Sequence, residues 1–231
     1  MPKSQYVRQM FAGIVPHYDC ANRILSGGQD ALWRRRLIRE VCAYRPEVVV
    51  DLATGSGEVA FALSKALGSE AKITGLDFCQ PMLDKAMEKQ SEMEGSDRVH
   101  FCLGDCQSLP FEDGTIDALC IAFGVRNLED RQRGFQEMYR VLRSGGSLFT
   151  LEFSQPYPFF RPFYYFYLKT LLPLLARWIT GQPEAYHYLV GSIEGFPTRA
   201  EITTEMQAVG FRKIRSIPLT FGVVAIHHAI A

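Results

Sequence analysis

Two carboxylates stand where consecutive apolar runs of the chain end, and a glycine-containing turn follows the first of them. Asp51 follows three valines and leads into a segment with Gly55, Ser56 and Gly57, and Asp77 ends the next apolar run. Glycines have no Cβ, so backbone N–H groups in such a turn can approach a ligand closely. A carboxylate at the end of the following strand can accept hydrogen bonds from both hydroxyls of a ribose. The spacing predicts a binding site for an adenosine-containing molecule.

The same glycines also fit the fingerprint of dinucleotide-binding enzymes, because Ala60 follows Gly55 and Gly57 at the third small position. An NAD(P)-dependent oxidoreductase is therefore one interpretation, and a cofactor-binding protein without catalysis is another. Asp51 favours a third interpretation, a protein that binds S-adenosylmethionine. The charge of Asp51 would repel a pyrophosphate, whereas it suits the positively charged sulfonium of S-adenosylmethionine. A further carboxylate, Asp105, follows the third apolar run.

Apolar runs alternate with helix-period segments through the middle of the chain, which is typical of a parallel sheet covered on both faces. We predict strands at residues 47–51, 72–77, 99–103, 116–122 and 147–153. Two more strands, 211–217 and 221–228, are too close in sequence for a helical crossover and must pair antiparallel. The predicted fold class is α/β, with a Rossmann-like, mostly parallel seven-stranded sheet and an antiparallel C-terminal hairpin. This fold favours a methyltransferase over a dehydrogenase.

Composition and charge argue against several further classes of protein. The 231 residues carry 25 basic and 25 acidic side chains, so no basic surface argues for a nucleic-acid partner. Six cysteines without a Cys-x-x-Cys pair suit reduced thiols in a cytosol, and predict no metal site. We expect a cytoplasmic protein, because the first residues resemble neither a signal peptide nor an Arg-rich presequence and no apolar stretch is long enough to span a membrane.

Further motifs lie outside the glycine turn. They include Phe11-x-x-Ile14-x-x-x-Tyr18-Asp19-x-x-Asn22, Leu109-Pro110-Phe111-x-Asp113, Phe123-Gly124-Val125-Arg126-Asn127, Leu151-Glu152-Phe153-Ser154-x-Pro156 and Tyr186-x-Tyr188-Leu189. With these motifs the chain resembles the ubiquinone/menaquinone biosynthesis C-methyltransferases over nearly its whole length. The resemblance implies an enzyme that moves a methyl group from S-adenosylmethionine to a ring carbon of a prenylated quinol. The acceptor it implies is demethylmenaquinol or the corresponding intermediate of the ubiquinone pathway.

The resemblance also implies roles for the residues of the predicted nucleoside site. The glycine turn with Ser56 would hold the methionine part of the cofactor, Asp77 the ribose hydroxyls, and Asp105 with Cys106 would flank the adenine. The chain departs from the family pattern at three places: Ser56 replaces a threonine, Glu58 an aspartate, and Ala122 a serine that would touch the cofactor.

The reaction is a displacement at the sulfonium methyl group by a ring carbon, so the acceptor must be positioned in line and made electron-rich. Ionising a quinol hydroxyl achieves the second requirement. Arg126 is the candidate for stabilising the resulting oxyanion, although it could instead form an ion pair with Glu129 or Asp130. The candidates for a general base are His17, Tyr18, Asp19, His187 and Tyr188, and a water molecule acting with Arg126 is an equal alternative.

An aromatic-rich segment at about residues 156–197 would be an insertion into the core fold, and residues 157–179 contain most of its rings. An exposed apolar surface of this kind suits a prenyl tail, the membrane surface that supplies it, or a homodimer contact. A lid buried against its own domain is the alternative. We expect a single methyltransferase domain over residues 1–231, with an N-terminal helical cap at about 1–45.

Overall fold

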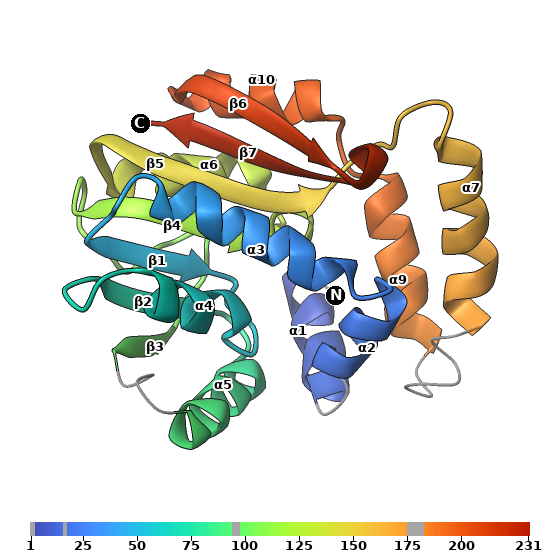
Figure 1. The fold of residues 1–231 in the computed structure, drawn as a ribbon, viewed down its shortest axis with the longest axis horizontal. Helices are drawn as coiled ribbons and strands as arrows, with labels where there is room; N and C mark the ends of the chain where they lie inside the picture. Colours follow the sequence, from blue (N-terminus) through green and yellow to red (C-terminus); the bar gives the residue numbers. More distant parts are fainter. Residues whose placement is uncertain (1–2, 16–17, 94–97, 175–182) are drawn as a thin grey trace.

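A seven-stranded sheet forms the centre of the protein in a computed structural model, which describes residues 3–15, 18–93, 98–174 and 183–231 (Figure 1). The strand order is β3-β2-β1-β4-β5-β7-β6. The strands are β1 (Val48–Leu52), β2 (Lys72–Asp77), β3 (Val99–Leu103), β4 (Ile116–Ala122), β5 (Leu142–Phe153), β6 (Arg212–Leu219) and β7 (Val224–Ile230). β1 to β5 run parallel, and β7 lies antiparallel between β5 and β6. The predicted fold class is confirmed.

Helices cover both faces of the sheet, because successive side chains of each strand point to opposite sides. In the described ranges, the helices of eight or more residues are α1 (Lys3–Ile14), α2 (Tyr18–Leu25), α3 (Gln29–Cys42), α4 (Glu58–Ala66), α5 (Gln80–Glu92), α6 (Arg131–Val141), α9 (Pro183–Glu194) and α10 (Arg199–Val209). Val49 belongs to the core under α3 and α4, whereas its neighbour Val50 belongs to the core under α6 and α10. Both faces of β1 are therefore buried, which explains its uninterrupted run of valines.

The strand boundaries differ most from the prediction at β5 and at the C-terminal strands. β5 begins at Leu142, because the backbone of Gly145 donates a hydrogen bond to Ala231 at the end of the chain (3.0 Å) and so extends the sheet. The C-terminal strands begin later than predicted. Residues 220–222 form a 3-10 turn, η4 (Thr220–Gly222), in which Phe221 has a positive φ of 53°.

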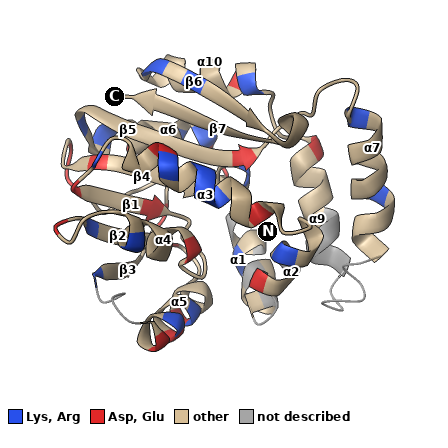
Figure 2. Cartoon of the chain, viewed as in Figure 1, with Lys and Arg blue, Asp and Glu red and all other residues tan. Residues whose placement is uncertain are grey.

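Several helices lie beyond the carboxyl ends of the parallel strands. Figure 1 shows α1, α2 and α9 there, together with the short helix α7 (Arg161–Phe166), which continues into a π-helix, η3 (Tyr167–Leu171). Acidic residues mark the carboxyl ends of β1 and β5 (Figure 2). Among the described residues, no helix combines the length and the apolar character that crossing a membrane requires.

Candidate active site

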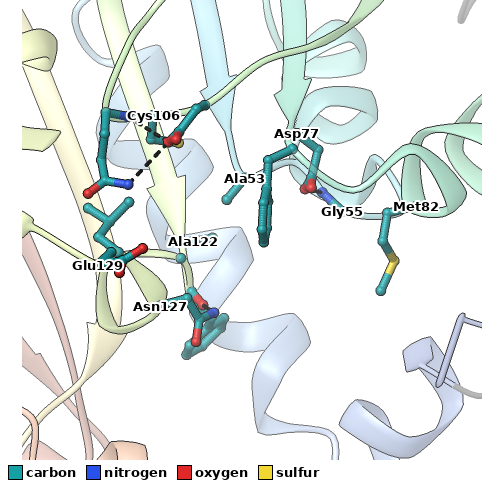
Figure 3. Close-up of a pocket in the computed structure, with 14 residues that line it drawn as sticks. Ala53, Gly55, Asp77, Met82, Cys106, Ala122, Asn127 and Glu129 are labelled. Carbon is teal, nitrogen blue, oxygen red and sulfur yellow. Dashed lines mark hydrogen bonds between the residues drawn. The ribbon is translucent and has the colours of Figure 1, made fainter. Parts of the chain in front are cut away.

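A cavity opens at the carboxyl ends of β1, β2 and β4 (Figure 3). The sheet order reverses between β1 and β4, which is where open α/β sheets bind their ligands. The lining residues follow the strand ends: Ala53, Gly55, Asp77, Phe78, Met82, Asp105, Cys106, Gln107, Ala122, Phe123, Gly124, Asn127, Leu128 and Glu129. Four of the predicted cofactor residues, Gly55, Asp77, Asp105 and Cys106, therefore line one cavity.

Asp77 ties the end of β2 to the glycine turn. Its Oδ2 accepts a hydrogen bond from the backbone N–H of Gly55 (2.8 Å), and its Oδ1 accepts one from Cys79 (2.9 Å). Burial raises the pKa of this carboxyl, and the two backbone hydrogen bonds oppose that rise. Each carboxylate oxygen still has a second lone pair, so both can accept a further hydrogen bond from a ligand.

Asp51 lies beneath the turn and does not line the cavity. It is only 1% exposed, and its carboxylate accepts hydrogen bonds from the Thr54 hydroxyl (2.6 Å) and the Cys120 thiol (3.5 Å). Burial raises the pKa of Asp51 to about 7, and the hydrogen bond from Thr54 opposes the rise. Asp51 thus supports the turn from behind and places an ionisable group close to it.

Ser56 points away from the cavity, toward the N-terminal helices. Its hydroxyl donates to Asp19 of α2 (2.7 Å). Lys89 of α5 then bridges Asp19 (2.6 Å) and Glu58 at the start of α4 (2.8 Å). These polar contacts hold α2 against the glycine turn.

The backbone around the cavity is strained. Ala53 and Phe123 follow β1 and β4, both line the cavity, and both adopt a positive φ, 51° and 58°, that non-glycine residues rarely use. Gly57 also has a positive φ, 84°, and a Cβ at this position would lie 2.6 Å from the ring of Phe61. The second glycine of the turn is therefore required by the fold itself, whereas the first lines the cavity.

Asp105 and Cys106 close the cavity beyond β3. The exposed carboxylate of Asp105 accepts a hydrogen bond from the backbone N–H of Gln107 (2.9 Å). Cys106 is buried, and its pKa is raised by burial and by the charges of Asp77 and Asp105, so it remains a neutral thiol. Cys106 can contact a ligand but is unsuited to act as a nucleophile.

The sequence interpretation missed several lining residues, among them Phe78, Met82 and Asn127. It looked for polar residues at strand ends, whereas Phe78 and Met82 are apolar. Their position was nonetheless a signal, because Phe78 directly follows Asp77 and Met82 lies in the first turn of the next helix. Arg8 of α1 stacks over the Phe78 ring (5.5 Å to its centroid), so α1 packs beside this end of the cavity.

A second, mostly apolar cavity of about 420 Å³ adjoins the first. Phe123 lines both. The walls of the second cavity come from α2, α3, β5, α7, η3 and α9, and include Leu25, Trp33, Phe153, Phe160, Phe163, Tyr164, Tyr167, Leu168, Leu172, Leu189, Ile193 and Val223. Its shape and apolar lining suit a hydrophobic ring with an attached chain.

Arg126 reaches the second cavity from η2 (Val125–Asn127), just after β4. Its guanidinium donates to Glu152 at the end of β5 (2.9 Å), and both side chains are almost fully buried. Glu152 also accepts from the backbone N–H of Arg126 (3.1 Å), and the guanidinium lies over the ring of Phe153 (5.3 Å). Sequence proximity had suggested an ion pair between Arg126 and Glu129 or Asp130. The side chain of Asp130 instead caps the N-terminus of α6.

The structure shows the side-chain contacts of two candidates for a general base, Asp19 and Tyr188. Asp19 is held by Ser56 and Lys89. The Tyr188 hydroxyl donates to Asn127 of the first cavity (3.2 Å). The remaining candidates, His17 and the side chains of Tyr18 and His187, lie outside the described residues.

Comparison with known proteins decides the family. The model of the ubiE/COQ5 methyltransferase family matches residues 1–231. The chain belongs to this family. Its identity as an S-adenosylmethionine-dependent C-methyltransferase of quinone biosynthesis, expected from the sequence motifs, is confirmed.

Relatives of the ubiE/COQ5 family match nearly full length. The demethylmenaquinone methyltransferase of Thermus thermophilus is 43% identical, over 94% of this chain and 98% of that protein. The ubiquinone/menaquinone biosynthesis C-methyltransferase UbiE of a Geobacter species is 37% identical, over 97% and 96%. A solved S-adenosylmethionine-dependent methyltransferase from Thermotoga maritima has a TM-score of 0.65 at 16% identity, covering 96% of this chain and 98% of that one, and shows the shared fold.

Proposed function

We propose that this enzyme methylates a ring carbon of a reduced, prenylated quinol, and that demethylmenaquinol is its principal acceptor. The observation that carries the proposal is the junction at Phe123 of two cavities with different chemistry. One has the strand-end carboxylates of a nucleoside site, and the other is apolar with a buried arginine. A menaquinone precursor is favoured because several relatives, including the Thermus thermophilus protein, are named for methylating it.

The first cavity fits S-adenosylmethionine. Asp77 would accept hydrogen bonds from the ribose hydroxyls, which are charge-assisted and therefore strong. Asp105 would accept one from the adenine amino group, beside Cys106 and Met82. The methionine part would lie along Gly55, close to the buried charge of Asp51. When bound, the cofactor would supply a methyl group on a positively charged sulfur: the ring carbon would bond to this methyl group, the electron pair of the broken carbon–sulfur bond would stay on sulfur, and the ring proton would be released to water.

Arg126 would stabilise the oxyanion of the acceptor. A quinol hydroxyl that loses its proton makes the neighbouring ring carbon electron-rich, and a guanidinium nearby favours this ionised form. Glu152 holds the guanidinium in place through the ion pair and through the backbone of Arg126. The side chains of Arg126 and Glu152 are almost fully buried, which strengthens the electrostatic interaction.

The mouth of the second cavity would accept the prenyl tail at a membrane surface. Phe163 and Ile24 line this cavity yet are 70% and 47% exposed, and Phe159, Phe166 and Leu174 add to the apolar surface. In Figure 2, the charges on the segment of α7 and η3 are all basic. We propose peripheral contact with anionic lipid on the cytoplasmic side of a membrane. Sedimentation with anionic vesicles tests it, and a homodimer that buries these rings would contradict it.

A methyl-transfer assay tests the function. We expect the protein to methylate reduced demethylmenaquinone in the presence of S-adenosylmethionine, and the oxidised quinone to remain unmethylated because it has no ionisable hydroxyl. The demethylated ubiquinol precursor, assayed in parallel, determines whether one or both pathways are served. Calorimetry should detect binding of S-adenosylhomocysteine but not of NADH. Absence of turnover with every reduced acceptor would contradict the proposal.

A further inference from the structure

Tyr164 places a hydroxyl group in the second cavity that has no protein hydrogen-bond partner. It is the buried residue of α7, at 8% exposure, and its ring lines the cavity. Within the part of the chain that the structure describes, the buried hydroxyl oxygen finds neither donor nor acceptor. A buried hydroxyl without a partner is costly, and native proteins rarely retain one unless a ligand or another group completes it.

Two other polar side chains of this cavity, Asp30 and Trp33, already have protein partners. Asp30 accepts a hydrogen bond from Ser26 (3.0 Å) and pairs with Arg34 (2.5 Å). The indole N–H of Trp33 donates to the hydroxyl of Thr220 (2.8 Å). The hydroxyl of Tyr164 differs from these groups because its hydrogen-bonding capacity is unused.

This hydroxyl also lies within electrostatic reach of the buried ion pair. The charge of Arg126 lowers the pKa of Tyr164 and that of Glu152 raises it, while burial raises it most. The net pKa is therefore higher than that of an ordinary tyrosine, so Tyr164 keeps its proton and can only donate it in a hydrogen bond. Tyr164 is thus suited to recognise an oxygen atom and unsuited to act as the base.

We propose that Tyr164 donates a hydrogen bond to the hydroxyl oxygen of the acceptor ring, next to Arg126, and so positions the ring carbon that receives the methyl group. The inference rests on the proposed function. Tyr164 transfers no proton. Two donors would then meet the same oxygen, the guanidinium from η2 and the phenol from α7, and only a ring with oxygen at the correct position could satisfy both.

The test compares two adjacent tyrosines. Tyr164→Phe removes the hydroxyl and keeps the ring, so we expect kcat/KM for reduced demethylmenaquinone to fall roughly 5- to 100-fold, with unchanged affinity for S-adenosylhomocysteine. Its melting temperature should not fall, because no protein partner is lost. Tyr165→Phe is the control. The Tyr165 hydroxyl donates to Gln155 (2.8 Å) and does not line the cavity, so its kcat/KM should stay close to that of the wild type.

The pH dependence of the reaction distinguishes hydrogen bonding from packing, because a Tyr164 that only packs against its neighbours would not affect it. Without the donor, the bound quinol hydroxyl ionises less readily, so the acid limb of kcat at saturating acceptor should move to higher pH in Tyr164→Phe. Wild-type kcat/KM with an unshifted kcat profile in this variant would overturn the inference and leave the proposed function intact. A loss of stability and cofactor affinity together with activity would also overturn it, in favour of a structural role. Inactivity of the wild type toward every reduced quinol would instead overturn the proposed function.

Discussion

At the scale of single residues, Arg126 and Glu152 form a buried ion pair, and the proposed role of Arg126 in the reaction must be separated from its role in stability. Arg126→Ala would leave Glu152 buried without the guanidinium, which typically destabilises a protein by about 3 to 5 kcal/mol. A loss of activity in that variant would therefore be ambiguous. The double variant Arg126→Met, Glu152→Gln removes both charges and should recover most of the stability.

We expect this double variant to bind S-adenosylhomocysteine normally and to turn over about 10²- to 10³-fold more slowly, because it lacks the oxyanion donor. Thermal unfolding and single-turnover rates measure the two effects separately. Recovered stability with wild-type turnover would mean that the arginine has no role in the reaction.

Asp77 gives a second prediction at this scale. Asp77→Asn should weaken S-adenosylmethionine binding by roughly 2 to 3 kcal/mol, since it removes the charged acceptor for the ribose hydroxyls. Asp117 is a matched control, because its carboxylate also accepts two backbone N–H groups, from Glu47 (2.8 Å) and Val48 (2.9 Å), but at the opposite ends of the strands. Asp117→Asn should lower the melting temperature and leave the calorimetric affinity unchanged. If Asp77→Asn and Asp117→Asn bind S-adenosylmethionine with equal affinity, Asp77 does not bind the ribose hydroxyls.

Residue types at strand ends made much of the lining of the first cavity predictable, because the sequence itself shows where each apolar run stops. The partner of Arg126 could not be predicted in the same way. The sequence interpretation considered only nearby acids, whereas Glu152 is brought in by the pairing of β4 with β5. The lack of a protein hydrogen-bond partner for the Tyr164 hydroxyl could not be predicted either, because it depends on every group that surrounds this hydroxyl in the folded protein.

At the scale of elements, the N-terminal helices are attached to the glycine turn by a few polar side chains. Lys89→Met should break the bridge between α2 and α4, and so speed the dissociation of S-adenosylhomocysteine several-fold. The effect on unfolding should be small, about 1 kcal/mol or less, because the three side chains are partly exposed. Stopped-flow measurements give the dissociation rate.

Lys85→Met is the control for this prediction. Lys85 pairs with Glu88 on the same helix (2.7 Å) and makes no link to α2 in the described contacts. Equal dissociation rates for the two variants would show that α2 does not restrain the cofactor.

Elements were predictable where local pattern and burial agree. β1 and β2 match their predicted positions closely because strands buried on both faces are mainly apolar and end where a carboxylate follows the apolar run. The early start of β5 depends on a backbone contact with Ala231, at the other end of the sequence, and no local pattern records such a contact.

At the scale of the whole molecule, buried ionisable groups have opposite effects on the free energy of unfolding between about pH 4 and 7. The pKa of Asp51 is raised to about 7 in the folded state, so its contribution to stability is present at low pH and is lost as pH rises toward 7. Burial lowers the pKa of His227 and His228 to about 4, so their contributions are present at neutral pH and are lost as pH falls.

Asp51→Asn isolates the first effect. The free energy of unfolding of this variant, relative to the wild type, should increase from pH 4 to pH 7 by on the order of 4 kcal/mol, and then level off. The histidines are common to both proteins, so their effects cancel in the difference. Denaturant unfolding across this range provides the measurement, and a difference independent of pH would show that Asp51 has an ordinary pKa.

The short helix α7 faces two environments at once. Tyr164 is buried on its inner side, while Phe163 and Phe166 are 70% and 60% exposed. If the outer rings enter lipid, the six-residue helix that carries Tyr164, the proposed donor to the acceptor, would also anchor the enzyme. Catalysis would then follow two-dimensional kinetics. At a fixed total amount of acceptor, added inert lipid should dilute the acceptor within the bilayer and slow the reaction.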